Sequence, residues 1–321
     1  YEISLGLVGS EMCIRDRERA AQIIYEHNVR DDGRLNRVYL NGATSIEGQL
    51  EDFANLIQGL LILFNVTGKQ QYLLQAVGLM DTTIHEFCDD REGGFFLGPH
   101  DQVGPQISRS RNAADGATIS PIATILDCLL RLLRCSALCD DTHSELYYRH
   151  YIDTCMASLT GQINENPVSH TSLLRVIEEY KSGCIDAIQY AGNGLAKIVV
   201  RKMSSASEDK LAVEINTYLE DGWHITAAEL STRGYVPLKF RMAERELCWE
   251  VHEVTYPSGT GSLMLNEDEV EIYKNHFTVS AILVRTEKVD DMLTSSVGVE
   301  LDLQLCDKNK CLLPETLQFV I

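Results

Sequence analysis

The sequence predicts a multidomain α and β protein, in which a helical part is followed by a β-sheet part. In the first part, hydrophobic residues recur every three or four positions, a spacing that places them on one face of an α-helix. From Ala196 onward the spacing changes to alternation over short runs, which is typical of half-buried strands. A third observation is that Cys306 and Cys311 flank a short charged segment near the end of the chain.

The helical part is predicted to be a partial α/α toroid at residues 18–190, because its helices pair through alternating short and long loops. Only about half the helices of a closed ring are expected. We therefore expect apolar side chains such as Leu60, Phe64 and Leu129 to be more exposed than in a complete ring. The expected helices cover residues 18–26, about 46–66, about 70–87, a segment that begins near 117, about 142–160 and about 171–180.

The β part is predicted to be an immunoglobulin-like sandwich at residues 191–321, since short strands separated by turn residues are typical of that fold. Pro314 ends the last regular pairing, because proline cannot donate to a strand ladder. His224 lies at an aromatic-rich strand end and is interpreted as structural. The expected strands cover residues 197–203, 211–219, about 238–240, 247–256, 269–274, 277–284, 297–305 and 317–321.

Composition and charge exclude several classes of partner. The 321 residues are 45% hydrophobic, as in globular proteins, and carry a net charge of −19 that is spread over both halves. Nucleic acids and anionic membrane surfaces are therefore not expected as partners. No apolar run reaches membrane-spanning length, so no direct membrane insertion is expected. The sequence has no phosphate-binding loop and no zinc-ligand spacing, which predicts no cofactor and no metal.

The first seventeen residues are treated separately. Residues 4–17 resemble a translated sequencing adapter, and the chain begins without methionine. The segment also lacks the charged and apolar regions of a signal peptide. Residues 1–17, with Cys13, are therefore interpreted as an artefact, and we expect the natural N-terminal portion to be missing from this sequence.

Four short motifs in the helical part resemble a known family. They are Asp32-Gly-Arg-Leu35, Leu50-Glu-Asp-Phe-Ala54, Gly93-Gly-Phe-Phe96 and Asp115-Gly-Ala-Thr-Ile-Ser120. Together they are similar to the C-terminal toroid of the thioredoxin-domain family that includes spermatogenesis-associated protein 20. The resemblance covers roughly residues 20–185. It implies a six-hairpin toroid related in fold to glycosidases and sugar epimerases, preceded in the family by a thioredoxin-like domain.

Two carboxylates fall within these motifs. Asp52 and Asp115 are expected near the starts of inner helices, where the loops of a toroid surround a central funnel. A carboxylate pair in such a funnel acts as acid and base when the pocket separates the two pKa values, which would suit a small sugar-like ligand. The alternative is that each carboxylate caps a helix.

The cysteine pair is the other candidate site. Cys306 ends one strand and Cys311 begins the next segment, so a hairpin would bring the two thiols within bonding range. Lys308 and Lys310 lie between them and would lower a thiol pKa, whereas Asp307 would oppose that effect. From the residues alone, the pair is a redox couple, a static staple of the hairpin, or two incidental cysteines.

The surrounding residues resemble the N-terminal domain of DsbD-type thiol:disulfide interchange proteins. Gln304, Cys306, Cys311, Pro314 and Thr316 match its terminal pattern, and the match extends over most of residues 195–321. The resemblance implies that Cys306 and Cys311 form a redox-active pair. It also implies a thioredoxin-like or other thiol-disulfide protein as the partner, and a periplasmic or extracytoplasmic compartment, although the sequence leaves a cytoplasmic one open.

Three hypotheses of function therefore stand. The chain is a thiol:disulfide exchange module joined to a toroid, a carbohydrate-active enzyme with an accessory β-sandwich, or a binding scaffold without catalysis. The first is favoured for the β part because two independent features, the hairpin spacing and the family pattern, point to Cys306 and Cys311.

Overall fold

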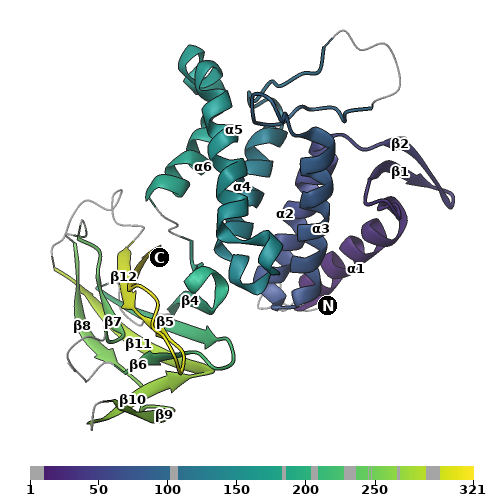
Figure 1. Cartoon of the computed structure of the whole chain (residues 1–321). Coiled ribbons are helices and arrows are strands. Elements are labelled where there is room, and N and C mark those ends of the chain that lie inside the picture. Colours follow the sequence, from purple (N-terminus) through teal and green to yellow (C-terminus); the bar gives the residue numbers. More distant parts are fainter. Residues whose placement is uncertain are drawn as a thin grey trace, which may run out of the picture. The chain divides into compact units, whose positions relative to one another are not determined.

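The computed structural model describes residues 11–101, 108–182, 186–203, 209–227, 236–244, 246, 248–265, 268–286 and 297–321. The chain forms two compact units. One consists of Tyr1–Leu133 with Asp141–Glu178, and the other of Arg134–Asp140 with Glu179–Ile321. The first is mainly helical and the second mainly β-sheet (Figure 1). Residues 1–10 of the suspected adapter segment lie outside the described residues, and residues 11–17 lie in the first helix.

The helical unit is built from a series of helices with one small β-hairpin between the first two. α2 and α3 join through Gly68, whose positive φ of 70° lets its N–H donate to the carbonyl of Phe64. The described elements are α1 (Glu11–Asn28), β1 (Asn36–Leu40), β2 (Ala43–Glu47), α2 (Leu50–Thr67), α3 (Gln70–Phe87), α4 (Pro121–Arg134), the 3-10 turn η2 (Asp141–His143), α5 (Glu145–Glu165), the 3-10 turn η3 (Pro167–His170) and α6 (Thr171–Ser182), which runs on into the second unit.

The expectation of exposed inner faces is wrong. Leu60, Phe64 and Leu129 are all buried. Their partners come from within the unit, since the Phe53 ring of α2 meets the Phe87 ring of α3 at a centroid distance of 5.2 Å. Cys128 of α4 also lies against the α2 backbone, with Sγ 3.9 Å from a carbonyl oxygen. The three helices therefore complete one another's cores.

The helix expected from about residue 46 begins later, at Leu50. The preceding residues pair as a two-stranded sheet, with Leu40 opposite Ala43. Asn41 and Gly42 make the turn with φ of 52° and 80°, the conformation that a two-residue hairpin with Asn-Gly adopts. The residues just before Leu50 therefore form the strand β2 and pair with β1, so they are not available to extend the helix.

The β unit contains three antiparallel sheets, whose orders are β3-β4-β5-β11-β8, β14-β12-β7 and β13-β6-β10-β9. Inward residues of the first two sheets, such as Ile215 and Val279 from one and Leu301 from the other, belong to one hydrophobic core. The strands are β3 (Ile188–Ala191), β4 (Ala196–Met203), β5 (Lys210–Leu219), β6 (His224–Thr226), β7 (Lys239–Met242), β8 (Trp249–Thr255), β9 (Gly261–Leu265), β10 (Asp268–Lys274), β11 (His276–Arg285), β12 (Gly298–Leu303), β13 (Leu305–Cys306) and β14 (Glu315–Val320). Two further 3-10 turns, η1 (Ser136–Leu138) and η4 (Gly192–Gly194), belong to this unit.

The strand expected over residues 297–305 is divided between two sheets. β12 pairs with β7 and β14, whereas β13 pairs with β6. The change occurs at Gln304, whose amide donates to the carbonyl of Leu312 at 2.9 Å and accepts from the N–H of Val236 at 3.1 Å. The side chain thus replaces the ladder bonds that are interrupted there, and the last two residues of the run are carried into the third sheet.

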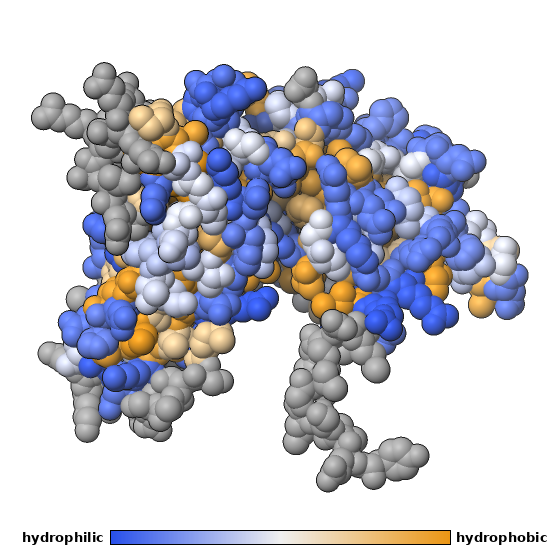
Figure 2. Space-filling view, turned by 90° about the horizontal axis from the view of Figure 1, so that it is seen from below, coloured by the Kyte–Doolittle hydropathy of each residue, from blue (hydrophilic) through white to orange (hydrophobic). Residues whose placement is uncertain are grey.

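Hydrophobic residues reach the surface in separate small groups among hydrophilic ones on the face shown in Figure 2. Within the described part of the chain, no helix has the length and apolar character needed to cross a membrane.

Candidate functional site

Cys306 and Cys311 form a disulfide at the end of the β13 hairpin, with a Cα–Cα distance of 4.0 Å. The two residues are directly opposite each other in an antiparallel bridge. The backbone hydrogen bonds lie on either side of them, from Leu312 N–H to Leu305 O and from Asp307 N–H to Lys310 O, each 2.8 Å long. The cysteines therefore form a non-hydrogen-bonded pair, the arrangement that brings opposite side chains closest. The predicted proximity of the two thiols is confirmed.

The turn between the cysteines is held by the Asp307 carboxylate. Its Oδ1 accepts from the N–H groups of Asn309 at 2.6 Å and Lys310 at 2.8 Å. These two bonds hold the pKa of Asp307 below its ordinary value. An aspartate that bonds the backbone of the residues after it in this way fixes a tight turn, so the negative charge that precedes the two lysines also has a structural role.

A glycine turn packs against the other side of the hairpin. Gly192 has a φ of 58°, and a Cβ atom there would lie 2.7 Å from Leu305 Cδ1 and 3.2 Å from Leu312 Cδ1. Its N–H donates to Glu315 Oε1 at 2.8 Å. Glycine at this position therefore lets the backbone approach both arms of the hairpin.

The two sulfur-bearing residues differ in exposure. Cys306 is only 2% exposed, whereas Cys311 is exposed to solvent. Thiol–disulfide exchange requires a thiolate to approach one sulfur along the S–S axis. Of the two residues, Cys311 is the more accessible to an approaching thiolate.

His224 lies beside the buried half of the disulfide. In the third sheet, Cys306 pairs with His224 of β6, and His224 pairs with Lys274 of β10. His224 is 8% exposed, and burial, then the charge of Lys274, lower its pKa against the opposing effect of Asp307. No local pattern predicts this row, because it depends on pairing between strands far apart in the chain.

The remaining described cysteines lack this accessibility. Four are buried and two are half-buried: Cys88, Cys128, Cys135 and Cys155 are buried, and Cys139 and Cys248 are half-buried. Burial raises the pKa of Cys88 to about 11 and that of Cys155 to about 12. These thiols stay protonated at neutral pH and are poor nucleophiles.

Asp52 is a helix cap at the start of α2. Its Oδ2 accepts from the Gln49 N–H at 2.8 Å and completes a capping box. Both oxygens of the same carboxylate accept from the Nε–H of Arg37, Oδ1 at 3.0 Å and Oδ2 at 2.9 Å. Both oxygens are therefore already occupied by partners from the same unit.

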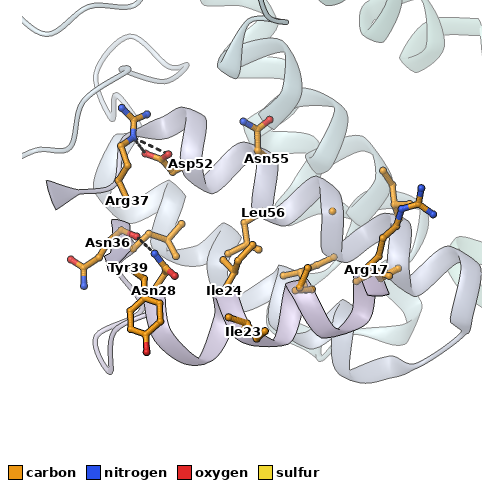
Figure 3. A pocket seen from close by; sticks show the side chains of 17 residues that line it. Arg17, Ile23, Ile24, Asn28, Asn36, Arg37, Tyr39, Asp52, Asn55 and Leu56 are labelled. Atoms are coloured by element: carbon orange, nitrogen blue, oxygen red, sulfur yellow. Dashed lines mark hydrogen bonds and ion pairs between the residues drawn. The ribbon is translucent and has the colours of Figure 1, made fainter. Parts of the chain in front are cut away.

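A groove of about 760 Å³ runs beside α2 (Figure 3). Arg37 and Asp52 lie at one end and Arg17 at the other, with the apolar side chains of Ile24 and Leu56 between them. Asp115 is not among the residues that line it.

Asp115 joins the starts of two helices instead. Its Oδ1 accepts from the N–H of Ser120, just before α4, at 3.0 Å. Its Oδ2 accepts from the N–H of Ser172 at 2.9 Å and the hydroxyl of Thr171 at 3.2 Å, at the start of α6. Burial opposes ionisation, but these bonds outweigh it and lower the pKa of Asp115. The structure gives Asp52 and Asp115 separate capping roles and does not bring them together in the groove.

No set of three or more histidine, cysteine, aspartate or glutamate side chains is placed to hold a metal ion within the described residues.

Comparisons with known proteins give a relative for the first half of the chain. No model of a known protein family matches. Spermatogenesis-associated protein 20 of the mouse is 25% identical over 189 residues, which is 55% of this chain and 23% of that protein. The human protein gives the same values, and the rat protein is 24% identical over the same length. The match falls on the N-terminal half, and the chain spans about a quarter of these relatives' length.

Solved structures give neighbours with low scores. The N-terminal periplasmic domain of ScsB from Proteus mirabilis has a TM-score of 0.30 and 15% identity, over 41% of this chain and 49% of that one. The DsbD N-terminal domain of Neisseria meningitidis, in its reduced form, has a TM-score of 0.25 and 13% identity, over 36% and 79%. The GAE domain of yeast GGA1 has a TM-score of 0.27 and 10% identity, over 42% and 96%. Scores of this size do not assign a function or a detailed fold.

Proposed function

We propose that the β unit is a thiol:disulfide exchange module that works through Cys306 and Cys311. The observation that carries the proposal is that an exposed Cys311 is bonded to a buried Cys306 at the end of a hairpin. A disulfide that only staples this hairpin closes a very short loop, which adds less stability than closing a long one. The hairpin also has its own hydrogen bonds, so exchange explains the pair better than stability does.

The exchange would proceed in two displacements with a dithiol partner. A partner thiolate attacks Cys311 Sγ, a new disulfide forms between the two proteins, and Cys306 leaves as a thiolate. The partner's second thiolate then attacks the partner's own sulfur in that mixed disulfide and releases Cys311. Two electrons pass from the partner dithiol to the cysteine pair, and the partner leaves as a disulfide. The reverse sequence would oxidise this protein.

We also infer the finer fold assignments. The helical unit is proposed to be part of an α/α toroid, supported by its paired helices and the relative found for that half. The β unit is proposed to be an immunoglobulin-like sandwich of the DsbD N-terminal type, supported by the shared core of two antiparallel sheets and the Gln304, Cys306, Cys311, Pro314 and Thr316 pattern. The same pattern supports a thioredoxin-like partner and an extracytoplasmic setting. The proposed division at residues 190 and 191 rests on the sequence.

Carbohydrate chemistry receives no such support. Asp52 and Asp115 each use both oxygens within the unit, and each sits at a helix start. A sugar-like ligand therefore stays a prediction from the sequence.

Thiol trapping across a glutathione redox series tests the proposal. We expect the pair to titrate as a single two-electron couple. When mixed with the oxidised, disulfide form of a thioredoxin-like protein, Cys306→Ser should accumulate a mixed disulfide through Cys311, and Cys311→Ser should accumulate far less because Cys306 is buried. Cys248→Ser, which changes a half-buried thiol of the same unit, is the matched control and should behave as the parent protein. Independent alkylation of the two thiols at every potential, or a bond that resists strong reductant, would overturn the proposal.

A further inference from the structure

The exchange proposed above creates a buried anion. When Cys311 is attacked, Cys306 is released as a thiolate at a position that is 2% exposed. Burial disfavours the charged form of a thiol, so a leaving group here needs a nearby donor or positive charge.

His224 is the polar side chain placed for that task. It is directly opposite Cys306 in the β6–β13 pair, where opposite Cβ atoms lie about 4.5–5.5 Å apart on the same face. Among the described residues, its ring nitrogens have no hydrogen-bond partner. The ring therefore has a donor available for an anion that forms on the adjacent sulfur.

The charged groups around His224 come from the two elements packed beside it. Lys274 faces it from β10, and Asp307 lies at the start of the turn after β13. Lys310 of the same turn lies over the ring of the neighbouring Trp223, 5.9 Å from its centroid. Burial and Lys274 lower the pKa of His224, which favours the neutral ring, and a neutral imidazole keeps one N–H to donate.

We propose that His224 stabilises the Cys306 thiolate by donating a hydrogen bond from its ring N–H, which makes it an assisting residue for the exchange. This rests on the proposed function. In the first displacement the S–S bond breaks, its electron pair goes to Cys306, and the ring N–H donates to that sulfur without transferring its proton. The proton that later converts Cys306 to a thiol comes from water. Lys274, on the other side of His224, adds positive charge to the same row.

The direct test measures the thiol and needs no partner. In Cys311→Ser, Cys306 is left as the one thiol of the pair, and its pKa can be followed by the ultraviolet absorbance of the thiolate. Adding His224→Phe should raise that pKa, whereas His224→Gln keeps an N–H donor that does not titrate and should restore part of the difference. His252→Gln, at an exposed histidine of β8 in the same unit, is the control and should leave the pKa unchanged.

The second test measures exchange in the protein with both cysteines. A hydrogen bond to a charged group contributes about 1.5–3 kcal/mol, so His224→Phe should slow reduction by glutathione about tenfold to hundredfold. The rate of reduction in His224→Gln should lie between the rates of His224→Phe and the parent protein. This second variant keeps the test valid if His224→Phe fails to fold. An unchanged Cys306 pKa in both His224 variants overturns the inference, even when the parent exchanges normally. Failure of the parent to exchange overturns the proposed function, while the thiol titration still decides the role of His224.

Discussion

The two candidate sites chosen from the sequence differ in how many of their bonding groups the fold has already used. Asp52 and Asp115 lie in the helical unit, and every carboxylate oxygen of theirs accepts from a group of that unit. In the β unit, the backbone groups of the hairpin are hydrogen-bonded to one another, but Cys311 is exposed. The ring of the nearby His224 has no hydrogen-bond partner among the described residues. A residue type that can do chemistry is thus a weak guide to a site until it is known whether its reactive atoms are exposed and free of hydrogen bonds within the fold.

The largest effect that would test this comparison is at Asp115. Asp115→Ala removes acceptors at the starts of two helices, and each lost cap costs about 0.5–2 kcal/mol. We expect the free energy of unfolding of the helical unit to fall by about 1–4 kcal/mol, as measured by urea unfolding followed by far-ultraviolet circular dichroism. Asp90→Ala, at an exposed aspartate of the same unit, should change it by less than about 0.5 kcal/mol. A similar small change at Asp115 would mean that its carboxylate is free for another role.

The contribution of Asp115 to stability should also depend on pH. The folded protein lowers the pKa of Asp115, so the carboxylate stabilises the fold fully above its unfolded pKa of about 4. That contribution is lost as the pH falls through the lower pKa of the folded state. The difference in unfolding free energy between the parent and Asp115→Asn should therefore be constant near neutral pH and shrink at acidic pH. A difference that grows on acidification would contradict the assigned hydrogen bonds.

Reduction of the disulfide should have a moderate effect on stability. The loop closed by Cys306 and Cys311 is short, and the chain-entropy relation gives about 2 kcal/mol for it. The two tryptophans, Trp223 and Trp249, both belong to the β unit, so their fluorescence reports unfolding of that unit alone. We expect the urea midpoint to fall on reduction and to fall equally in Cys306→Ser. Complete loss of the fold on reduction would favour a structural staple over an exchange site.

At Asp52 the expected effect is smaller. Asp52→Ala breaks the capping box and the pair with Arg37, which should lower the stability of the helical unit by about 1 kcal/mol. Exchange at the cysteine pair should be unaffected, because the two residues belong to different units. Unfolding in urea measures the stability of the helical unit, and the glutathione trapping assay measures the exchange. A change in the exchange rate would show that the two sites are coupled.

The smallest expected effect concerns the two lysines of the turn. Lys308 and Lys310 are exposed, and their charges favour the approach of an anionic thiolate to Cys311. Replacing both by glutamine should slow reduction by glutathione about twofold to fivefold at low salt, and the difference should vanish at high salt. Lys202→Gln, at an exposed lysine of β4, should have no effect. A difference that persists in high salt would indicate a change in the turn itself.

Local signals in the sequence were sufficient for much of the fold. The spacing of apolar residues gave the helix from Gln70 to Phe87 with its observed ends, and the alternation of residues gave most strands of the β unit. The hairpin of Cys306 and Cys311 was also predictable, because its turn lies within a few residues of both strands. Asn41-Gly42 carried an equally local turn signal that was overlooked, and the helix was placed too early, over the end of the second strand of the hairpin.

Features that depend on distant pairing were beyond the reach of the sequence. The row of Cys306, His224 and Lys274 exists because three strands from separate parts of the chain share one register. The cap that Asp115 places on α6 likewise joins segments that no periodicity connects. The change of sheet at Gln304 depends on a side-chain amide bonding two other segments. In each case a single residue acts through tertiary contacts, whereas patterns report only local periodicity.

The hydrogen bonds of the hairpin bear on the direction of electron flow in the proposed exchange. Bonds from Leu312 to Leu305, from Asp307 to Lys310, from Gln304 to Leu312, and from Asn309 and Lys310 to the Asp307 carboxylate are all independent of sulfur. The loop should thus keep nearly the same shape whether the bond is open or closed, and little reorganisation accompanies each turnover. In the proposed exchange, a cysteine pair that takes up two electrons without a change in backbone shape is equally suited to accepting and to donating them. The potential of whichever protein docks next, and not a conformational gate, would then decide which of the two occurs.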